Sequence, residues 1–524
     1  MEGKHHMKRM IAATLTLALT TAALAGCAAN AAAPTDDQNT VAAATMSNET
    51  GKTPKYVFLF IGDGMSYPQI QSTSDYLGAL NDEDYWQAQP SLDDNQGAIL
   101  DGPEYLNFMN FEGVGTAVTY DSNSFAPDSA STATSISTGH KTYSGSINVD
   151  ETGTVKYETI AEQLRDQKDW EIGVITSVNL NHATPAAFYA HQASRSSYYE
   201  IGLELIDSDF DYFAGGGLLD PTGSEGDQED LYALAEAAGY TVAKTNAEAE
   251  AVSASTDKAI LIDEDLADSD AMAYELDRTD DMWSLADYVA KGIEVLDNDT
   301  GFFLMCEGGK IDWACHANDA GSSIHDTQAL ADAVQVAIDF AAEHPEETLI
   351  LVTGDHETGG LTIGFAGTDY DTYLDLLANQ KISFAKYDSD YVAKYKENKT
   401  SFEDVLVDIE ALFGLKTEGE EGDKLVLTDY ELEQLRAAYE KSINGTATSQ
   451  YEQEEYVLYG TYEPLSVTIT HIINNKSGVS FTSYSHTGLP VAVLAEGVGA
   501  EQFSGYYDNT EIYNKLAALV GVTA

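Results

Sequence analysis

The sequence is poor in cysteine and in basic residues, and each shortage excludes a class of protein. Three cysteines among 524 residues cannot form the disulfide framework of a small secreted domain. Lysine and arginine number 26 against 87 aspartates and glutamates, which gives a formal net charge of −61. Because a surface this acidic repels nucleic acid and anionic membranes, neither is expected to bind the chain.

The N-terminal apolar run is shorter than the ~20 residues of a spanning helix. From Met7 the chain reads MKRMIAATLTLALTTAALAGCAAN, in which a basic start precedes the apolar stretch, as in a secretory signal. The ending LAGC resembles the lipobox of bacterial lipoproteins. This resemblance implies a signal peptide over 7–26, lipidation of Cys27 and an extracytoplasmic chain anchored to the bacterial cell membrane, in the periplasm or at the cell surface. The alternative is an ordinary signal peptide cut near residues 25–28.

The rest of the chain has the composition and the pattern of a globular α/β protein. Residues 27–53, rich in Ala, Thr, Asn and Asp, indicate a flexible tether. Short apolar runs that alternate with helical stretches favour a largely parallel sheet. We predict strands over 55–62, 114–120, 171–177, 210–217, 301–309, 347–354 and 489–497, and helices over 156–167, 185–195, 281–297 and 325–343. Residues 367–480 are rich in Tyr, Lys and Glu, with helix-like segments at 401–414 and 428–443, and we interpret them as an insertion.

Side chains that could bind metal ions or take part in catalysis follow several of these apolar runs. Ligands of open α/β sheets bind at the carboxyl ends of the strands, so these positions are the candidates for a site. They are Asp63, His182, Thr184, Arg195, Glu307, Asp312, His316, Asp355 and His356, with His486 just before the last strand. Taken singly, each has a plainer interpretation: Thr184 before Pro185, for example, suits a helix cap.

Taken together, these residue types indicate bound metal ions, because carboxylate, hydroxyl and imidazole are the ligands that Zn²⁺ and Mg²⁺ prefer. Asp312 and His316 are four residues apart, so one helical turn directs both toward one ion. Asp355 and His356 are adjacent in a short loop and suit a second ion. Cys306 and Cys315 are interpreted as packing residues.

A stretch of small residues, PDSASTATSISTGH at 127–140, holds a candidate nucleophile. The run from Ser129 to Gly139 is compatible with a helix, so Ser129 is either a helix cap or the reacting hydroxyl. A helix N-terminus favours a bound anion, and Arg195 offers a fork that fits two phosphoryl oxygens. Two metal ions about 4 Å apart stabilise in-line displacement at phosphorus. These features predict phosphoryl transfer.

The same motifs resemble the alkaline phosphatase family. GDGM at Asp63, PDSASTATSISTG, HATPAAFYAHQASR, EGGKID with His316, TGDHETGG and SHTG stand in the order of that family. The resemblance covers 54–366 and 481–524, which we expect to form the catalytic domain, with 367–480 as a crown-like subdomain inserted in it.

The resemblance also implies the ligand sets and the cofactors, two Zn²⁺ and one Mg²⁺. Asp312, His316 and His486 would hold the first zinc, and Asp63, Asp355 and His356 the second, with Ser129 as its labile ligand. Asp63, Thr184 and Glu307 would hold magnesium, and Asp128 would orient Arg195.

Two positions depart from the best-known enteric bacterial members, which carry aspartate and lysine where this chain has His182 and Trp313. The contact that the lysine makes with phosphate through water is therefore expected to be absent. His182 is expected to support the magnesium ligands without binding the ion itself.

The sequence thus predicts a phosphomonoester hydrolase that acts through a phosphoserine on Ser129, with small phosphomonoesters as substrates and a homodimer as the family's usual assembly. One alternative is a phosphodiesterase or sulfatase-like relative on the same two-metal core, although Ser129 with Arg195 favours monoesters. A catalytically weak surface binding protein is another, but it would be expected to lack part of the ligand set.

Overall fold

The structure, a computed structural model, describes residues 51–82, 85, 100–445 and 453–523. The predicted signal peptide, Cys27 and all of the tether before residue 51 lie outside the described residues. Among the helices of the described residues, none combines the length and the apolar character needed to cross a bilayer.

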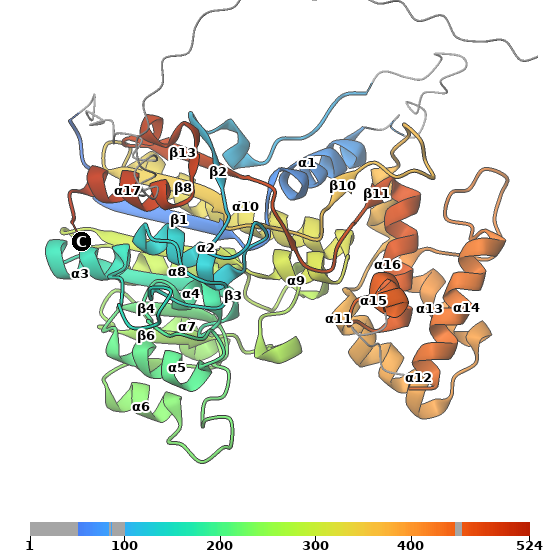
Figure 1. The fold of residues 1–524 in the computed structure, drawn as a ribbon, viewed down its shortest axis with the longest axis horizontal. Helices are drawn as coiled ribbons and strands as arrows, with labels where there is room; N and C mark the ends of the chain where they lie inside the picture. Colours follow the sequence, from blue (N-terminus) through green and yellow to red (C-terminus); the bar gives the residue numbers. More distant parts are fainter. Residues whose placement is uncertain (1–50, 83–84, 86–99, 446–452, 524) are drawn as a thin grey trace, which may run out of the picture. The chain divides into compact units, whose positions relative to one another are not determined.

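A ten-stranded sheet forms the centre of the fold (Figure 1). Its order is β14-β2-β13-β8-β1-β7-β3-β4-β6-β5, and β13 is antiparallel to both of its neighbours while the other pairs are parallel. The strands are β1 (Tyr56–Gly62), β2 (Gly113–Val118), β3 (Glu171–Asn179), β4 (Tyr212–Gly216), β5 (Thr241–Ala243), β6 (Ala259–Ile262), β7 (Phe302–Gly308), β8 (Thr348–Gly354), β13 (Val491–Gly497) and β14 (Gly505–Asp508). The predicted α/β class with a mostly parallel sheet is confirmed.

Both faces of the sheet are apolar, which is why helices cover both. In β1, Val57 and Leu59 belong to one core cluster, and Phe58 and Phe60 to another, because successive side chains alternate between faces. The first cluster includes side chains of α2 (Ser129–Thr138), α3 (Ile160–Lys168), α4 (Ala183–Ala186), α5 (Tyr198–Asp207), α6 (Leu231–Ala237) and α17 (Thr510–Val520). The second includes side chains of α1 (Tyr67–Asn81), α7 (Asn246–Ala251), α8 (Leu285–Leu296), α9 (Lys310–His316) and α10 (Ala320–Glu343).

The register of the three central strands sets the position of the site. Gly62 of β1 pairs with Gly308 of β7 on one side and with Gly354 of β8 on the other. Asp63 and Asp355, which directly follow β1 and β8, therefore leave the sheet at the same level. A two-stranded ladder of β9 (Glu357–Thr358) and β12 (His486–Thr487) brings the C-terminal His486 to this edge.

The predicted helix over 185–195 does not form as one helix. A short helix, α4, ends at Ala186, and the chain then runs through turns to Arg195. Its N-cap is His182 and not Thr184, which lies inside the first turn. The apolar residues that suggested a longer helix, such as Phe188 and Ala190, are buried in this turn region.

The described part of 367–480 is helical (orange in Figure 1). Its helices are α11 (Phe384–Tyr387), α12 (Ala393–Asn398), α13 (Phe402–Phe413), α14 (Asp429–Ile443), α15 (Gln453–Tyr459) and α16 (Pro464–Ser477). All of them except α15 contribute to a core cluster shared with α1 and α10, to which Tyr76 and Ile324 also belong. A second ladder, β10 (Thr362–Ile363) with β11 (Val479–Ser480), joins the two ends of the segment. The domain division itself stays a prediction.

Candidate active site

The N-terminus of α2 presents Ser129. Asp128 is the N-cap of this helix and accepts a hydrogen bond from the backbone N–H of Ser131 at 3.1 Å. The cap position is therefore filled by the residue before Ser129, and the Ser129 hydroxyl is left to face the site. Gly139 ends the helix in the left-handed region, at φ 75°.

Ser129 lies against a first cluster of buried ligand-type side chains, Asp63, Asp355 and His356. The Ser129 hydroxyl is 3.1 Å from Nε2 of His356 and 3.4 Å from a carboxylate oxygen of Asp63. Nε2 of His356 is in turn 3.2 Å from Asp63 and 3.4 Å from Asp355. One ligand atom from each of the three residues lies within 4.8 Å of the others, as a shared metal ion requires.

The loop after β8 is fixed by hydrogen bonds to Asp355. One carboxylate oxygen accepts from the backbone N–H groups of Gly64 (3.2 Å) and His356 (2.8 Å). The other accepts from the Thr132 hydroxyl at 3.0 Å, which connects this loop to α2. The cluster is thereby held in place before any ligand binds.

A second cluster joins Asp312, His316 and His486. Nε2 of His316 lies 3.3 Å from Asp312 and 3.1 Å from Nε2 of His486, and His486 lies 3.6 Å from Asp312. Asp312 and His316 share one turn of α9, as their spacing predicted. Asp312 and His486 also lie within ligand distance of His356, so the two clusters adjoin.

Both histidines of this cluster are oriented by backbone carbonyls. Nδ1 of His316 donates to the carbonyl of Tyr484 at 2.7 Å, and Nδ1 of His486 donates to the carbonyl of Pro127 at 2.6 Å. These bonds place the proton on Nδ1 and leave the Nε2 lone pairs facing each other and Asp312. This is the arrangement that a metal-binding histidine needs.

Glu307 and Thr184 lie on the other side of Asp63. The Thr184 hydroxyl donates to Asp63 at 3.3 Å, and Glu307 accepts a hydrogen bond from Thr176. The second oxygen of the fully buried Glu307 carboxylate has no hydrogen-bond partner among the described residues. A buried carboxylate oxygen without a partner is costly, and a bound cation would remove that cost.

Arg195 reaches the site from the turn region after α4. It donates to Asp128 at 2.9 Å and to Nε2 of His182 at 3.2 Å. Burial raises the pKa of the Asp128 carboxyl, but the Arg195 charge together with hydrogen bonds from Gly145, Ser131 and Arg195 holds that pKa below its usual value. Burial, together with the same arginine, lowers the pKa of His182 to about 4, so this imidazole is neutral. His182 thus contacts Arg195, and its ring meets Trp313 edge to face at 5.9 Å.

The electrostatics of the ligand clusters favour divalent cations. Burial and the neighbouring charge of Asp63 raise the pKa of Asp355 to about 8. Burial and Asp63 likewise raise the pKa of Glu307 well above its usual value. Buried carboxylates this close ionise together only when positive charge compensates them. The donor types, their burial and the orphaned Glu307 oxygen therefore fit metal ions at this site.

A cavity of about 360 Å³ opens onto Ser129 and Arg195. Five of its lining residues were not predicted from the sequence: Asp268, Ser269 and Tyr274, and from the insertion Phe384 and Tyr462. No local motif marks them, because they come from loops and from the insertion and meet only in the folded chain.

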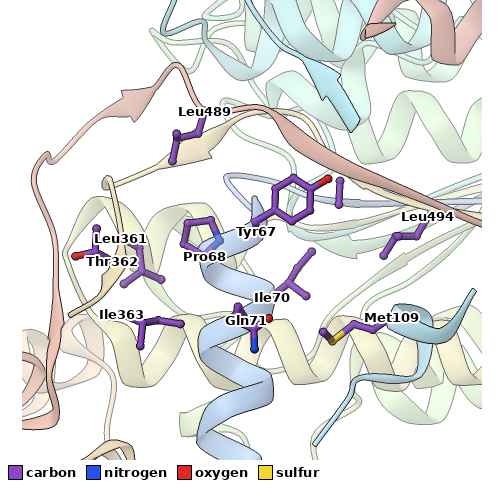
Figure 2. A pocket seen from close by; sticks show the side chains of 11 residues that line it. Tyr67, Pro68, Ile70, Gln71, Met109, Leu361, Thr362, Ile363, Leu489 and Leu494 are labelled. Carbon is purple, nitrogen blue, oxygen red and sulfur yellow. The ribbon is translucent and has the colours of Figure 1, made fainter. Parts of the chain in front are cut away.

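A larger cavity of about 530 Å³ lies elsewhere and is almost entirely apolar. Figure 2 shows side chains from α1, from the β10 segment and from β13 around it, among them Tyr67, Ile70, Leu361 and Leu494. Because no carboxylate or imidazole that could hold a metal ion lines it, the reaction belongs to the smaller cavity.

Comparisons with known proteins point to one family. The model of the alkaline phosphatase family matches residues 54–522. "Alkaline phosphatase 4" of Bacillus subtilis is 30% identical over 468 residues, which cover 87% of each chain. A cold-active alkaline phosphatase from Shewanella superposes with a TM-score of 0.69 at 28% identity, over 89% of this chain and 99% of that one. A variant of the TAB5 alkaline phosphatase, solved with magnesium bound, superposes with a TM-score of 0.59 at 25% identity, over 90% of this chain and 99% of that one.

Proposed function

The chain belongs to the alkaline phosphatase family and is a phosphoric monoester hydrolase, and from this premise we propose that Ser129 carries the phosphoryl group during the reaction. The observation that supports this most directly is the place of the Ser129 hydroxyl, at a helix N-terminus and beside both His356 and Asp63. The serine oxygen forms a bond to phosphorus and loses its proton while the bond from phosphorus to the ester oxygen breaks, and the departing oxygen takes up a proton and leaves as the alcohol. Water then hydrolyses the phosphoserine, which restores the hydroxyl and releases inorganic phosphate.

The ligand clusters support a proposal of two zinc ions and one magnesium ion. Asp312, His316 and His486 would hold one zinc, Asp63, Asp355 and His356 the other, and Asp63, Thr184 and Glu307 the magnesium. When bound, such ions lower the pKa of a nearby hydroxyl and stabilise the attacking and leaving oxygens. The structure of a TAB5 variant with bound magnesium supports the third site by similarity.

Arg195 is proposed to hold two phosphoryl oxygens through its guanidinium fork. Asp128 positions this fork through its 2.9 Å contact, and His182 supports its other edge. Trp313 supplies no charge to the phosphate, so Arg195 is expected to be the main cationic side chain that binds it.

The nucleophile is tested by Ser129→Ala, with Ser135→Ala as the matched control because Ser135 is a buried serine further along the same helix. We expect Ser129→Ala to lose about a thousandfold or more in phosphate release from a nitrophenyl monoester, and the control to keep nearly all of it. Acid quenching should trap phosphoserine in the unmodified protein and not in Ser129→Ala. Full activity of Ser129→Ala with zinc and magnesium present would disprove the assignment.

Two other functions are separated by simple measurements. A phosphodiesterase or sulfatase-like enzyme would hydrolyse a nitrophenyl diester or sulfate faster than the monoester in the same preparation. A catalytically weak binding protein would hold fewer than two divalent ions per chain by metal analysis.

We also propose that the chain is exported, lipidated at Cys27 and tethered to the outer face of a bacterial membrane by residues 27–53. The lipobox-like ending LAGC supports this. Replacement Cys27→Ser should move the protein from the membrane fraction to the soluble fraction. A homodimer is proposed from the family resemblance, and light scattering should then give about twice the mass of one chain.

A further inference from the structure

Four aromatic side chains form one side of the active-site cavity: Tyr274, Trp313, Phe384 and Tyr462, here called the aromatic wall. We propose that the aromatic wall binds the alcohol portion of the substrate and makes the enzyme prefer monoesters of uncharged alcohols that carry a planar aromatic ring. This inference rests on the proposed function, because it assumes that the phosphoryl group binds between Ser129 and Arg195.

The position of the wall follows from the cavity it shares with the reacting groups. Ser129, Arg195 and the cluster of Asp312, His316 and His486 line the same space of about 360 Å³. When the phosphoryl group contacts Ser129 and Arg195, the alcohol portion must occupy the remainder of this space. Trp313 directly follows Asp312 on α9, so the wall begins next to the ligand cluster.

One half of the wall is held rigidly by a buried lysine. Nζ of Lys310 lies 4.2 Å from the centre of the Tyr274 ring and 4.6 Å from that of Trp313. Lys310 is fully buried and pairs with Asp268 at 2.7 Å. Such cation–π contacts fix both rings in place, so a ligand ring meets a preformed surface.

The other half comes from the insertion. The Phe384 ring packs against Tyr274 at 5.7 Å and against Tyr462 at 5.8 Å, both steeply inclined. Phe384 lies on α11 and Tyr462 just before α16, so both belong to residues 367–480. Steeply inclined neighbouring rings are the arrangement into which a further aromatic ring packs well. The insertion thus supplies part of the substrate site.

Charge limits the class of alcohol. Lys310, the cation that contacts the wall, is already paired with Asp268, and the Asp268 side chain itself lines the cavity. Lys310 is therefore not free to bind a second phosphate or a carboxylate on the alcohol. Neutral aromatic alcohols fit this surface best.

The test compares benzyl phosphate with cyclohexylmethyl phosphate, whose alcohols are of similar size and are both primary. We expect kcat/KM to favour the benzyl ester by about threefold to tenfold, the range that a favourable ring contact gives. Phe384→Leu and Tyr462→Leu keep apolar bulk but remove a ring, and each should bring the ratio toward one. Tyr430→Leu, an exposed tyrosine on α14 of the same insertion, should leave the ratio unchanged.

A binding measurement separates this inference from the proposed mechanism. Calorimetry with benzylphosphonate and cyclohexylmethylphosphonate, which are not hydrolysed, should show the same preference in the unmodified protein and its loss in Phe384→Leu. Equal affinity and equal kcat/KM for both partners of each pair, or variants that weaken both equally, would overturn the role of the wall. Activity retained by Ser129→Ala would instead overturn the mechanism and leave the binding preference intact.

Discussion

Asp128 performs two tasks through its two carboxylate oxygens, and one substitution separates them. One oxygen accepts from the N–H groups of Ser131 (3.1 Å) and Gly145 (2.9 Å), which caps α2 and fixes the neighbouring loop. The other accepts from Arg195 at 2.9 Å. In Asp128→Asn the amide oxygen still caps the helix, because asparagine is as good an N-cap as aspartate. The amide NH₂ cannot accept from Arg195, so only the second task is lost.

The size of the effect follows from the burial of the pair. The side chains of Arg195 and Asp128 are 25% and 19% exposed, so solvent screens their contact only in part. A hydrogen bond to a charged group contributes about 1.5–3 kcal/mol. Arg195 keeps its 3.2 Å contact with His182, so we take the lower end. A loss of about 1.5 kcal/mol in the positioning of Arg195 corresponds to about a tenfold weaker affinity for inorganic phosphate.

The assay is competitive inhibition of monoester hydrolysis by inorganic phosphate. We expect the inhibition constant to rise about tenfold in Asp128→Asn, with the melting temperature lowered by only about 1–2 °C in a chain of this length. Asp128→Ala is the control, because it also removes the cap and should lose about 1 kcal/mol of stability in addition. An inhibition constant within about twofold of the unmodified protein, at full metal content, would refute the view that Asp128 positions Arg195.

Three further predictions concern stability. Gly139→Ala places a methyl group 2.5 Å from the Tyr513 ring at a positive φ and should cost about 1–3 kcal/mol of unfolding free energy. The control Gly445→Ala, also at a positive φ but with no described atom within 4 Å, should lower the unfolding free energy less in the same denaturation experiment. Removal of divalent ions by chelation should lower the melting temperature by about 4 °C, the shift that a loss of about 4 kcal/mol gives in a chain of this length. Adding zinc and magnesium should restore the melting temperature. No shift on chelation would argue against bound ions. Burial, and then the charge of Asp211, raise the pKa of Glu171 from 4.5 to about 7 in the folded chain, so ionisation of Glu171 destabilises the fold as the pH rises through that interval. Glu171→Gln should therefore melt at a higher temperature than the unmodified protein at about pH 8 and at nearly the same temperature at about pH 4. A gain in melting temperature confined to low pH would contradict the raised pKa.

The long apolar runs predicted the centre of the sheet, because a strand buried on both faces needs an almost continuous apolar sequence. β1, β7 and β8 lie where the runs at 55–62, 301–309 and 347–354 placed them. Their parallel register then brings Asp63 and Asp355 to one edge, which is why the candidate site could be located from sequence. The short strands β5 and β6 were not predicted, since three and four residues leave too little pattern to recognise.

Other features depended on contacts distant in sequence. The run from His182 to Arg195 has helical apolar spacing, but its buried residues pack in turns, and no local signal distinguishes the two. The identity of the α2 cap was equally ambiguous, because Asp128 and Ser129 are both good capping residues. Phe384 and Tyr462 reach the cavity only because the insertion folds back onto α9 and the residues around Tyr274. Local patterns therefore marked the candidate reacting groups, whereas the side chains of the proposed aromatic wall come together only in the folded chain.

Because the antiparallel strand β13 lies near the C-terminus, the site is assembled late in synthesis and folding. β13 lies between β2 and β8, and only after the insertion does the chain return to place it and the preceding His486. The ligand-type residues thus span the sequence from Asp63 to His486, and β13, which joins β2 to β8, comes after all of them. A chain still in synthesis, or one cut short before residue 486, lacks both β13 and His486, so its sheet and its set of ligand-type residues are incomplete. The topology therefore delays hydrolytic activity until nearly the whole polypeptide exists and has folded.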